Sequence, residues 1–319
     1  MTAGSMCSGY GGLDLAVSEV LGTRLLWVAD NDPNAALCLA HRFPDAPNLG
    51  DIRAVDWARV PAPDVVAAGF PCQPVSSAGL GLGLDDERWL LDDIADAVGR
   101  MEPRPRLLVL ENVDGLLSAN RGHAMARVVS RLAALGYMGR YRVLRASDVG
   151  APHQRARIFI LAWPATDPAH LRHQRHRHPG QRRPGPAHGG QPAPHPQSDG
   201  RHPWRPQPAR QLRRPDPAVT DGPAVEWGRY EAAIRRWEHL TGRPAPCPTE
   251  PAPRGGRRLA PPFSEWLMGL SAGWVTAVPD ISRNGQLHLI GNGVVPQQAI
   301  AALLDLLPDH LALDRKEAA

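Results

Sequence analysis

One cysteine, Cys72, stands in a sequence that favours nucleophilic chemistry. Residues 69–74 read Gly-Phe-Pro-Cys-Gln-Pro and directly follow the apolar run 65–68. A proline fixes its own φ and restricts the residue before it, so Pro71 and Pro74 leave the backbone around the thiol few conformations. We therefore expect a buried strand that delivers the thiol on a stiffened loop, held for attack. The alternative is a buried, inert thiol.

Charged side chains at later positions could assist such a nucleophile. The block 106–111, Arg-Leu-Leu-Val-Leu-Glu, is an apolar run that ends in Glu111, as a central strand does when it presents a carboxylate at its carboxyl-terminal edge. Arg155 and Arg157 alternate along an expected strand, so we predict that both side chains point to the same face. The competing interpretations are a helix cap for Glu111 and a surface ion pair for the arginines.

Residues 1–52 contain the elements of a nucleotide-type binding site. A strand meets the glycine-rich turn 8–12, Ser-Gly-Tyr-Gly-Gly, before a helix begins, which lets the backbone approach a ligand at the helix N-terminus. Asp30 ends the next strand, about twenty residues later, where an acid can accept hydrogen bonds from ribose hydroxyls. Asp51 and Ile52 follow the third segment. These features predict a cofactor that carries adenosine, and the lack of a Gly-x-Gly-x-x-Gly pattern disfavours NAD.

The residues that could do chemistry fall at the ends of alternating elements. Residues 1–163 alternate apolar, strand-like runs with helix-like periodic segments, which is typical of βα repeats around a parallel sheet. We therefore predict an α/β fold with a doubly wound, Rossmann-like sheet. The expected strands span 2–7, 25–30, 64–68, 107–111, 140–146 and 157–162, and the expected helices span 12–21, 33–42, 89–101 and 121–135.

This alternation stops at a segment of biased composition. Residues 165–225 hold 13 Pro, six Gly, seven of the 13 His, ten Arg and four Asp, with no Lys or Glu. Ten positive and four negative charges give this segment +6, so the rest of the chain, whose total is +4, sums to −2. With so few aliphatic side chains it cannot bury enough surface to offset ordering, so we expect it to be partly flexible. A segment that contacts phosphates, a solvated linker, and metal binding by the His/Arg run 170–178 are the alternatives.

Helical spacing returns after this segment. Residues 226–241 place five large side chains on one helical face, which predicts the core helix of a small lobe, and residues 297–307 read as an amphipathic helix that ends before Pro308. The face of the first helix consists of Trp227, Tyr230, Ile234, Trp237 and Leu240.

Bulk composition narrows the class of protein. A chain of 319 residues can bury one substantial core and a smaller second lobe. It has no run of about twenty apolar residues and no signal-peptide pattern, so we expect no membrane partner. The four cysteines, at 7, 38, 72 and 247, show no close metal-ligand spacing, which favours a reducing, cytoplasmic setting and no bound metal. The 35 arginines beside a single lysine indicate a high-GC source.

Six motifs, in order, resemble those of the cytosine-5 DNA methyltransferases, which use S-adenosylmethionine. The resemblance covers roughly residues 1–163 and 257–307, and the long variable segment lies where the family has one. The motifs are Ser-Gly-x-Gly-Gly at 8–12, Pro-Cys-Gln at 71–73, Glu-Asn-Val at 111–113, His-Gln-Arg-Ala-Arg at 153–157, Glu-Trp-Leu-Met-Gly at 265–269 and Gly-Asn-Gly-Val-Val-Pro at 291–296.

The resemblance implies a reaction at C5 of cytosine. Addition of the Cys72 thiolate to C6 would make C5 enamine-like, so that it can attack a methyl sulfonium. Glu111 would stabilise the charge on the ring from a position near N3, and burial would raise its pKa and keep it protonated. Arg157 would contact the cytosine O2 and orient this acid, whereas Arg155 would hold the loop or a nearby phosphate. No side chain is an obvious base for the final proton removal, so water is the candidate.

The resemblance also implies base flipping and a set of cofactor contacts. C6 is inaccessible inside a duplex stack, so the target base must leave it, and Gln73 and Ser76 lie on the loop that would close behind or over it. The cofactor-binding residues that it implies, together with those of the glycine-rich turn, are Cys7, Ser8, Gly9, Gly11, Gly12, Asp30, Asp51, Ile52, Pro71, Asn292 and Val294.

Three departures from the family pattern bear on cofactor affinity rather than on the reaction class. Cys7 stands where an aromatic residue usually packs against the adenine. Asp30 and Asn31 stand in place of a usual Glu and Trp. His153 begins the arginine motif in place of Gln.

The expected architecture has two lobes. Residues 1–163 bind the cofactor and catalyse, residues 258–319 return to complete this domain, and residues 164–257 form a smaller target-recognition lobe in the major groove of double-stranded DNA. We expect a monomeric, prokaryotic or phage-like enzyme, with a companion restriction endonuclease as a potential partner. Two alternatives stay open: the same chemistry on RNA, notably tRNA, and a catalytically silent DNA-binding relative.

Overall fold

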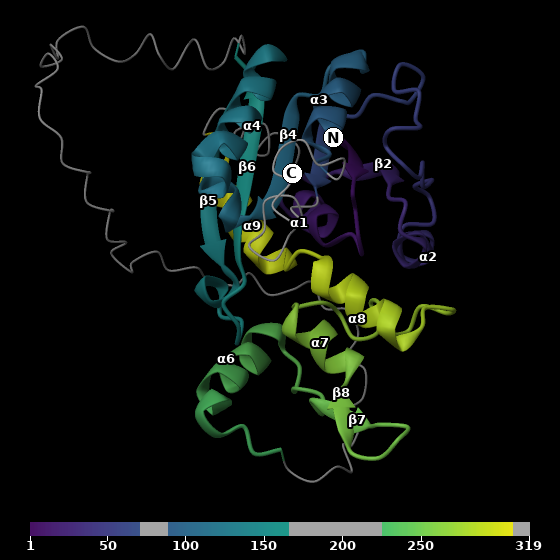
Figure 1. Cartoon of the computed structure of the whole chain (residues 1–319), viewed down its shortest axis with the longest axis vertical. Helices are drawn as coiled ribbons and strands as arrows, with labels where there is room; N and C mark the ends of the chain where they lie inside the picture. The colour runs from purple at the N-terminus through teal and green to yellow at the C-terminus, as the bar shows by residue number, and fades with distance from the viewer. Residues whose placement is uncertain (71–88, 166–224, 309–319) are drawn as a thin grey trace, which may run out of the picture.

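A six-stranded sheet with helices on both faces forms one part of the molecule (Figure 1). The computed structural model describes residues 1–70, 89–165 and 225–308. Within residues 1–163, each helix and strand begins and ends within three residues of its predicted bounds, which confirms the α/β, Rossmann-like prediction. The strands are β1 (Thr2–Met6), β2 (Arg24–Ala29), β3 (Val65–Gly69), β4 (Leu107–Val113), β5 (Tyr137–Arg145) and β6 (Ala156–Pro164), and the helices are α1 (Gly12–Leu21), α2 (Pro33–Arg42), α3 (Leu91–Arg100) and α4 (His123–Ala134).

The sheet has the order β2-β1-β3-β4-β6-β5 and is not wholly parallel. Strands β1 to β4 run parallel, whereas β6 is inserted antiparallel between β4 and β5. The prediction of a parallel sheet was therefore wrong for β6. The short link 146–155 explains the reversal, because parallel neighbours need a crossover of a dozen or more residues, usually a helix.

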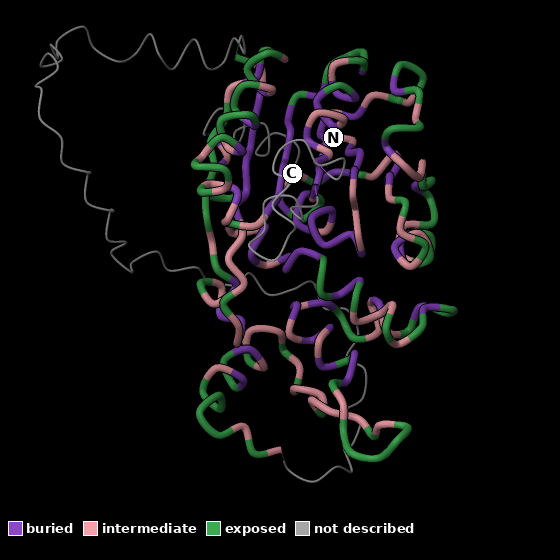
Figure 2. Tube along the Cα trace, in the orientation of Figure 1, coloured by how far each residue is buried: buried purple, intermediate pink, exposed green. Residues whose placement is uncertain are grey.

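Alternate residues of the central strands enter two different cores. Val66 and Ala68 of β3 pack in the core that α3 and α4 cover. Val65 and Ala67 pack in the core that α1 and α9 (Pro296–Leu306) cover. Successive side chains of a strand point to opposite faces, so a central strand buried on both faces reads as a continuous apolar run. Figure 2 shows these strands buried along their length.

A smaller group of elements lies below the sheet in Figure 1, and its buried apolar side chains form one cluster with those of α2 and Tyr10. It contains α6 (Glu231–Thr241), α7 (Pro261–Leu267) and the ribbon of β7 (Thr249–Pro251) and β8 (Arg257–Leu259). The Trp237 indole N–H donates to the Trp266 carbonyl at 2.9 Å, and both side chains are buried. The prediction that Tyr230 joins this core was wrong, because residues 228–230 form a 3-10 turn ahead of α6 and leave Tyr230 52% exposed.

The last elements lead the chain back to the sheet. Helix α8 (Arg283–Asn292) packs on α7 and α2, and α9 packs on α1, β5 and β6, as the predicted amphipathic helix 297–307 requires. Gly293 separates α8 from α9 with an extended backbone. The stretch Arg283–Leu306 is long and apolar enough to span a membrane, but 56% of its apolar window is buried inside the protein, as in a core helix.

Candidate active site

The carboxyl-terminal edge of the sheet gathers most of the predicted site residues that the structure describes. From β1 the chain passes to β2 on one side and later to β3 on the other, which makes this a switch point of the kind where open α/β sheets bind ligands. Cys7 follows β1, Asp30 follows β2 and Phe70 follows β3. Glu111 lies in β4, level with Gly69 at the end of β3.

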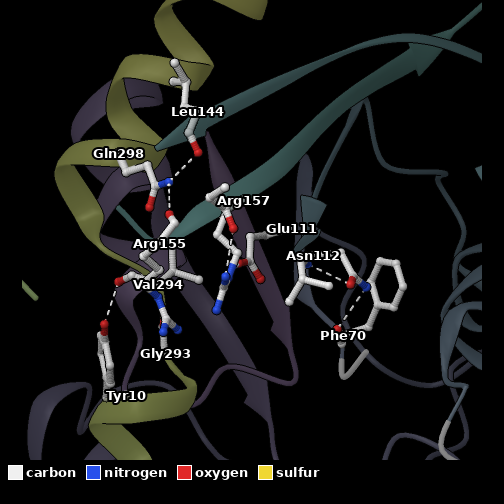
Figure 3. Close-up of polar contacts among 12 residues, drawn as sticks. Tyr10, Phe70, Glu111, Asn112, Leu144, Arg155, Arg157, Gly293, Val294 and Gln298 are labelled. Atoms are coloured by element: carbon white, nitrogen blue, oxygen red, sulfur yellow. Dashed lines mark hydrogen bonds and ion pairs between the residues drawn. The ribbon is translucent and has the colours of Figure 1, made fainter. Parts of the chain in front are cut away.

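The reversal of β6 brings Arg157 to this same edge. Because β6 runs antiparallel to β4, its first residues lie beside the end of β4, with Arg157 opposite Val113 and Phe159 opposite Glu111. Glu111 and Arg157 are therefore diagonal neighbours on one face, a separation that long side chains can bridge. The Arg157 Nε lies 3.0 Å from Oε1 of Glu111 (Figure 3).

Glu111 carries the electrostatics expected of an acid that exchanges a proton. Glu111 is only 7% exposed. Burial raises the pKa of Glu111, and the positive charges of Arg157 and then Arg155 oppose the rise. The raised pKa agrees with the prediction for a carboxylate at a strand edge. A buried carboxyl whose cationic neighbours oppose the effect of burial can both hold and release a proton.

Arg155 does not lie on the strand with Arg157, so the prediction that the two alternate along one strand was wrong. β6 begins at Ala156, and Arg155 precedes it with a φ of +29°, in the left-handed region. Its Nη2 donates to the Gly293 carbonyl at 2.6 Å. Arg155 therefore holds the junction between α8 and α9, and it remains near enough to Glu111 to lower the pKa of that carboxyl.

Asn112 anchors the chain next to the Cys72 loop, although no role was predicted for it. Asn112 is 1% exposed, and its Nδ2 donates to the Phe70 carbonyl at 3.2 Å. The Phe70 ring meets the Trp89 ring edge-on, with centroids 5.8 Å apart. The chain is thus held on both sides of residues 71–88. The predicted residues Pro71, Cys72, Gln73 and Ser76 lie outside the described residues.

A cavity of about 410 Å³ opens at this edge and is lined by both predicted sets of residues. Ligand pockets in proteins have volumes of roughly 300–1,000 Å³, so a nucleoside cofactor fits. Glu111 and Arg157 are part of the wall, so the candidate acid faces the same space as the cofactor residues. The predicted cofactor residues in the wall are Cys7, Ser8, Gly9, Asp30, Asp51, Ile52, Asn292 and Val294.

Asp30 holds the glycine-rich turn in place. Its Oδ2 accepts from the Gly9 N–H at 2.8 Å and its Oδ1 accepts from the Asp32 N–H at 2.9 Å. Cys7 and Gly9 both have left-handed φ values, +53° and +57°, so the turn folds back sharply. A carboxylate offers about four acceptor sites, so these two bonds leave Asp30 able to accept from ligand hydroxyls.

The charges of the cavity suit a cationic ligand. Hydrogen bonds from Arg53 lower the pKa of Asp51 to about 2, which keeps this carboxylate ionised. Burial raises the pKa of the Cys7 thiol to about 12, so the thiol stays neutral. S-adenosylmethionine carries a sulfonium and an ammonium group, and a wall that holds four carboxyl groups, including Asp51, against the two guanidinium groups of Arg53 and Arg157 fits that donor.

Gly11 and Gly12 do not line the cavity; they let other parts of the chain approach. The Tyr10 hydroxyl donates to the Val294 carbonyl at 2.6 Å. A Cβ on Gly12 would lie 2.3 Å from that same carbonyl oxygen. Gly11 has a φ of +81° and caps α1. Gly12 therefore lets the turn 8–12 pack against the returning C-terminal segment, which supplies the far wall, whereas a Cβ on Gly11 would meet the Phe43 ring.

Side chains that commonly bind metals do not gather anywhere in the described part of the chain: no three His, Cys, Asp or Glu residues lie close enough to share an ion. His153 accordingly has a packing role, since its Nε2 lies 3.0 Å from the Leu267 carbonyl oxygen, and burial lowers its pKa.

The arrangement of strands and helices is that of solved methyltransferases. The crystal structure of the S. pombe Dnmt2 methyltransferase matches with a TM-score of 0.58 and 13% identity, over 99% of each chain. The Entamoeba histolytica methyltransferase EhMeth matches with a TM-score of 0.60 and 14% identity, over 99% of this chain and 98% of that one. The protein therefore has a Rossmann-like methyltransferase fold.

Sequence comparison narrows this class to one family. The model of the C-5 cytosine-specific DNA methylases matches residues 1–188, more than half of the chain, and the chain belongs to that family. Type II methyltransferase M2.BsuMI of Bacillus subtilis (strain 168) is 36% identical over 167 residues, which are 51% of this chain and 42% of that protein. Type II methyltransferase M.NgoBI of Neisseria gonorrhoeae is 36% identical over 157 residues, which are 49% of this chain and 48% of that protein. These matches span about half the length of each relative.

Proposed function

We propose that this chain is an S-adenosylmethionine-dependent DNA methyltransferase that methylates C5 of a cytosine within a short sequence of double-stranded DNA. The observation that carries the proposal is the buried Glu111–Arg157 pair. It faces a cavity of cofactor size at the sheet edge where the Cys72 loop begins, in a chain of the C-5 cytosine-specific methylase family.

In the proposed reaction, the Cys72 thiolate forms a bond to C6 of a flipped-out cytosine, and the C5–C6 π electrons move through the ring toward N3. Glu111 donates its proton to N3, so that no negative charge remains on the ring, while Arg157 holds the carboxyl and reaches the cytosine O2. The cofactor, when bound, would supply the electrophilic methyl group that C5 takes, and its sulfur would keep the electron pair of the broken carbon–sulfur bond as a neutral thioether.

The second half of the reaction restores the aromatic ring. Water removes the proton from C5, the electrons of that bond reform the C5–C6 double bond, and the C6–sulfur bond breaks to release the Cys72 thiolate. Glu111 recovers its proton from N3 and is ready for another cycle. The positive charge of Arg157 limits the rise in the pKa of Glu111, which makes both transfers of the proton accessible.

The cavity residues divide the binding of the cofactor between them. Asp30 accepts hydrogen bonds from ribose hydroxyls and Asp51 provides a counter-charge to the cation. Cys7 offers a small neutral surface to the adenine, and Asn292 and Val294 close the pocket from the C-terminal side. Gln73 and Ser76 lie on the loop that closes over the flipped-out cytosine or behind it, in the space that the base leaves in the duplex.

The remaining proposals concern the lobes and the setting. Residues 164–257 form the target-recognition region, which contacts the major groove, and residues 258–319 complete the catalytic domain. We propose that the enzyme is monomeric, and a setting in the prokaryotic cytoplasm agrees with the bacterial origin of the type II relatives. Those relatives also support a partnership with a restriction endonuclease.

Base-resolution mapping of 5-methylcytosine tests the function directly. DNA and RNA from cells that express the chain would be mapped beside material from cells that express Cys72→Ala. We expect methylation of DNA at one short sequence and none with the variant. Methylation of RNA alone would transfer the chemistry to the RNA alternative, and soluble wild-type protein that methylates neither would overturn the proposal.

A further inference from the structure

A buried amide on α9 holds the backbone that carries the two candidate site arginines. Gln298 is 0% exposed. Its Nε2 donates to the Leu144 carbonyl at 2.7 Å and to the Arg155 carbonyl at 2.9 Å (Figure 3). Leu144 lies near the end of β5 and Arg155 directly precedes β6, so one amide nitrogen ties both sides of the β5–β6 link.

The orientation of this amide is dictated by its surroundings. Both groups that face Nε2 are carbonyl oxygens, which only accept hydrogen bonds. A flipped amide would place Oε1 against them and lose both bonds. In the observed orientation Oε1 is buried and has no hydrogen-bond partner. A buried oxygen without a partner costs free energy, so the two bonds made by Nε2 are the interactions that account for a glutamine here.

Arg155 and the C-terminal segment hold each other reciprocally. The Arg155 guanidinium donates to the Gly293 carbonyl, while the Arg155 carbonyl accepts from Gln298, five residues further along the same segment. The backbone of Arg155 is in the left-handed region, which a residue with a long side chain rarely adopts without support. Gln298 supplies that support from the helix that also packs on α1.

The Arg155 carbonyl that Gln298 holds lies two residues before Arg157, whose Nε is 3.0 Å from Oε1 of Glu111. A small rotation of the backbone at Arg155 would carry the Arg157 side chain away from the carboxyl at the diagonal position on β4. Gln298 itself is absent from the wall of the cavity that Glu111 and Arg157 line. Its action on the reaction is therefore indirect.

We infer that Gln298 is a positioning residue, which sets the orientation of Arg157 toward Glu111 through the Arg155 carbonyl. This inference rests on the proposed function, because it assigns the acid and its orienting arginine to the methyl-transfer step. It adds a part of the site that lies behind the sheet edge and comes from the C-terminal helix.

The test compares two neighbouring glutamines in the same turn of α9. Gln298→Met keeps the length of the side chain and removes the donor. Gln297→Met is the matched control, because the Gln297 Nε2 donates to the Gly269 carbonyl at 2.8 Å and does not contact Arg155. Single-turnover methyl transfer to duplex DNA would be measured across the neutral pH range, together with S-adenosylhomocysteine binding and thermal unfolding.

For Gln298→Met we expect a single-turnover rate lower by about ten- to a hundredfold, the cost of a small misplacement at a reacting centre, with cofactor affinity changed little. We also expect the limb of the pH profile on which Glu111 loses its proton to move to higher pH, since a displaced Arg157 lowers the pKa of Glu111 less. A loss of folded protein alone would not move that limb. Gln297→Met should keep both the rate and the profile.

Gln298→Glu provides a second route if the methionine variant does not fold. Its carboxyl can donate to a carbonyl only when protonated, so the rate should recover as the pH falls. A folded Gln298→Met enzyme with the wild-type rate and profile, or an equal defect in Gln297→Met, would overturn the inference. Failure of the proposed function looks different, because the wild-type chain itself would then transfer no methyl group.

Discussion

Arg157 and Glu111 meet across two strands that run in opposite directions, with Nε and Oε1 3.0 Å apart. Both side chains are largely shielded, with 17% and 9% of their surfaces exposed. The pair sits at the one edge of the sheet where the ends of the parallel strands and the start of β6 coincide. Its geometry makes the protonation of Glu111 depend on the placement of Arg157.

Substitution of Glu111 should slow the chemical step rather than DNA binding. Glu111→Gln removes the transferable proton but keeps the size of the side chain, and we expect single-turnover methyl transfer to fall by about 10²–10⁴-fold, the range for a general acid. Rapid-quench assays measure the rate, and gel-shift titrations measure the affinity. Glu102→Gln, at an exposed position, is the control. A wild-type rate for Glu111→Gln would exclude this residue from proton transfer.

Substitution of Arg157 should change the pH dependence. The positive charge of Arg157 is the largest of the effects that lower the pKa of Glu111, so its removal lets burial raise that pKa further. In Arg157→Gln the fall in rate that accompanies deprotonation of Glu111 should therefore move to higher pH, with a lower maximum. The measurement is the single-turnover rate as a function of pH. A lower rate with an unchanged pH dependence would show that Arg157 acts only on the cytosine and not on the pKa of Glu111.

Tyr10→Phe should weaken the closure of the cofactor cavity. The variant loses the bond to the Val294 carbonyl and leaves that buried oxygen without this donor, which costs about 1–3 kcal/mol of stability. We expect a lower free energy of unfolding and weaker binding of S-adenosylhomocysteine, measured by denaturant titration and calorimetry. Tyr141→Phe serves as the control because Tyr141 is 53% exposed. Equal effects in the two variants would contradict a special role for Tyr10.

Asp14 should make the protein less stable as the pH rises. The residue is 3% exposed. Burial is the main cause that raises the pKa of Asp14 from 3.8 to about 6; hydrogen bonding to the Ser5 hydroxyl and to the backbone of Asp14 opposes the rise, and the negative charge of Asp30 adds to it. A raised pKa in the folded state means that folding is favoured while Asp14 is protonated. The contribution is complete below pH 3.8 and is lost as the pH rises through about 6.

Asp14→Asn tests this because the amide stays neutral. The change in pKa corresponds to roughly 3 kcal/mol at most, so the variant should approach that gain in the free energy of unfolding at pH values well above 6 and show none near 3.8. Denaturant titrations at several pH values measure the difference. Asp45→Asn, at an exposed position, should show no such trend. A gain for Asp14→Asn that does not vary with pH would rule out the titration of Asp14 as its cause.

The sequence predicted the elements of the sheet well because its central strands are buried on both faces. Runs such as 65–68 and 107–110 are apolar throughout, and turns bound them, so their positions are encoded locally. The direction of β6 is not encoded in its own residues, since an apolar strand reads the same in either direction. That direction follows from the shortness of the link 146–155.

The site was predicted in part for the same reason. Cys7 and Asp30 follow strands and Glu111 lies two residues before the end of β4, and their convergence follows from the topology. The contacts of Arg155, Asn112 and Gln298 join segments distant in sequence, and most end on backbone carbonyls, which every residue carries. The type of the residue whose carbonyl accepts therefore does not indicate that such a hydrogen bond forms. The unusual φ of Arg155 likewise depends on support from α9, about 140 residues later.

The hydrogen bond between Tyr10 and Val294 joins residues separated by 284 positions, so the cavity can close only after both segments have been synthesised. Strands β1 to β4 leave the ribosome early, and with them the turn 8–12 and the carboxyl of Glu111. The segment that closes the cavity follows roughly 15–60 s later at a translation rate of about 5–20 residues per second. Until then the growing chain has its acid and its glycine-rich turn but no enclosed place for a methyl donor. Under the proposed function, an unfinished chain is therefore expected to transfer no methyl group to DNA until the two distant segments have met.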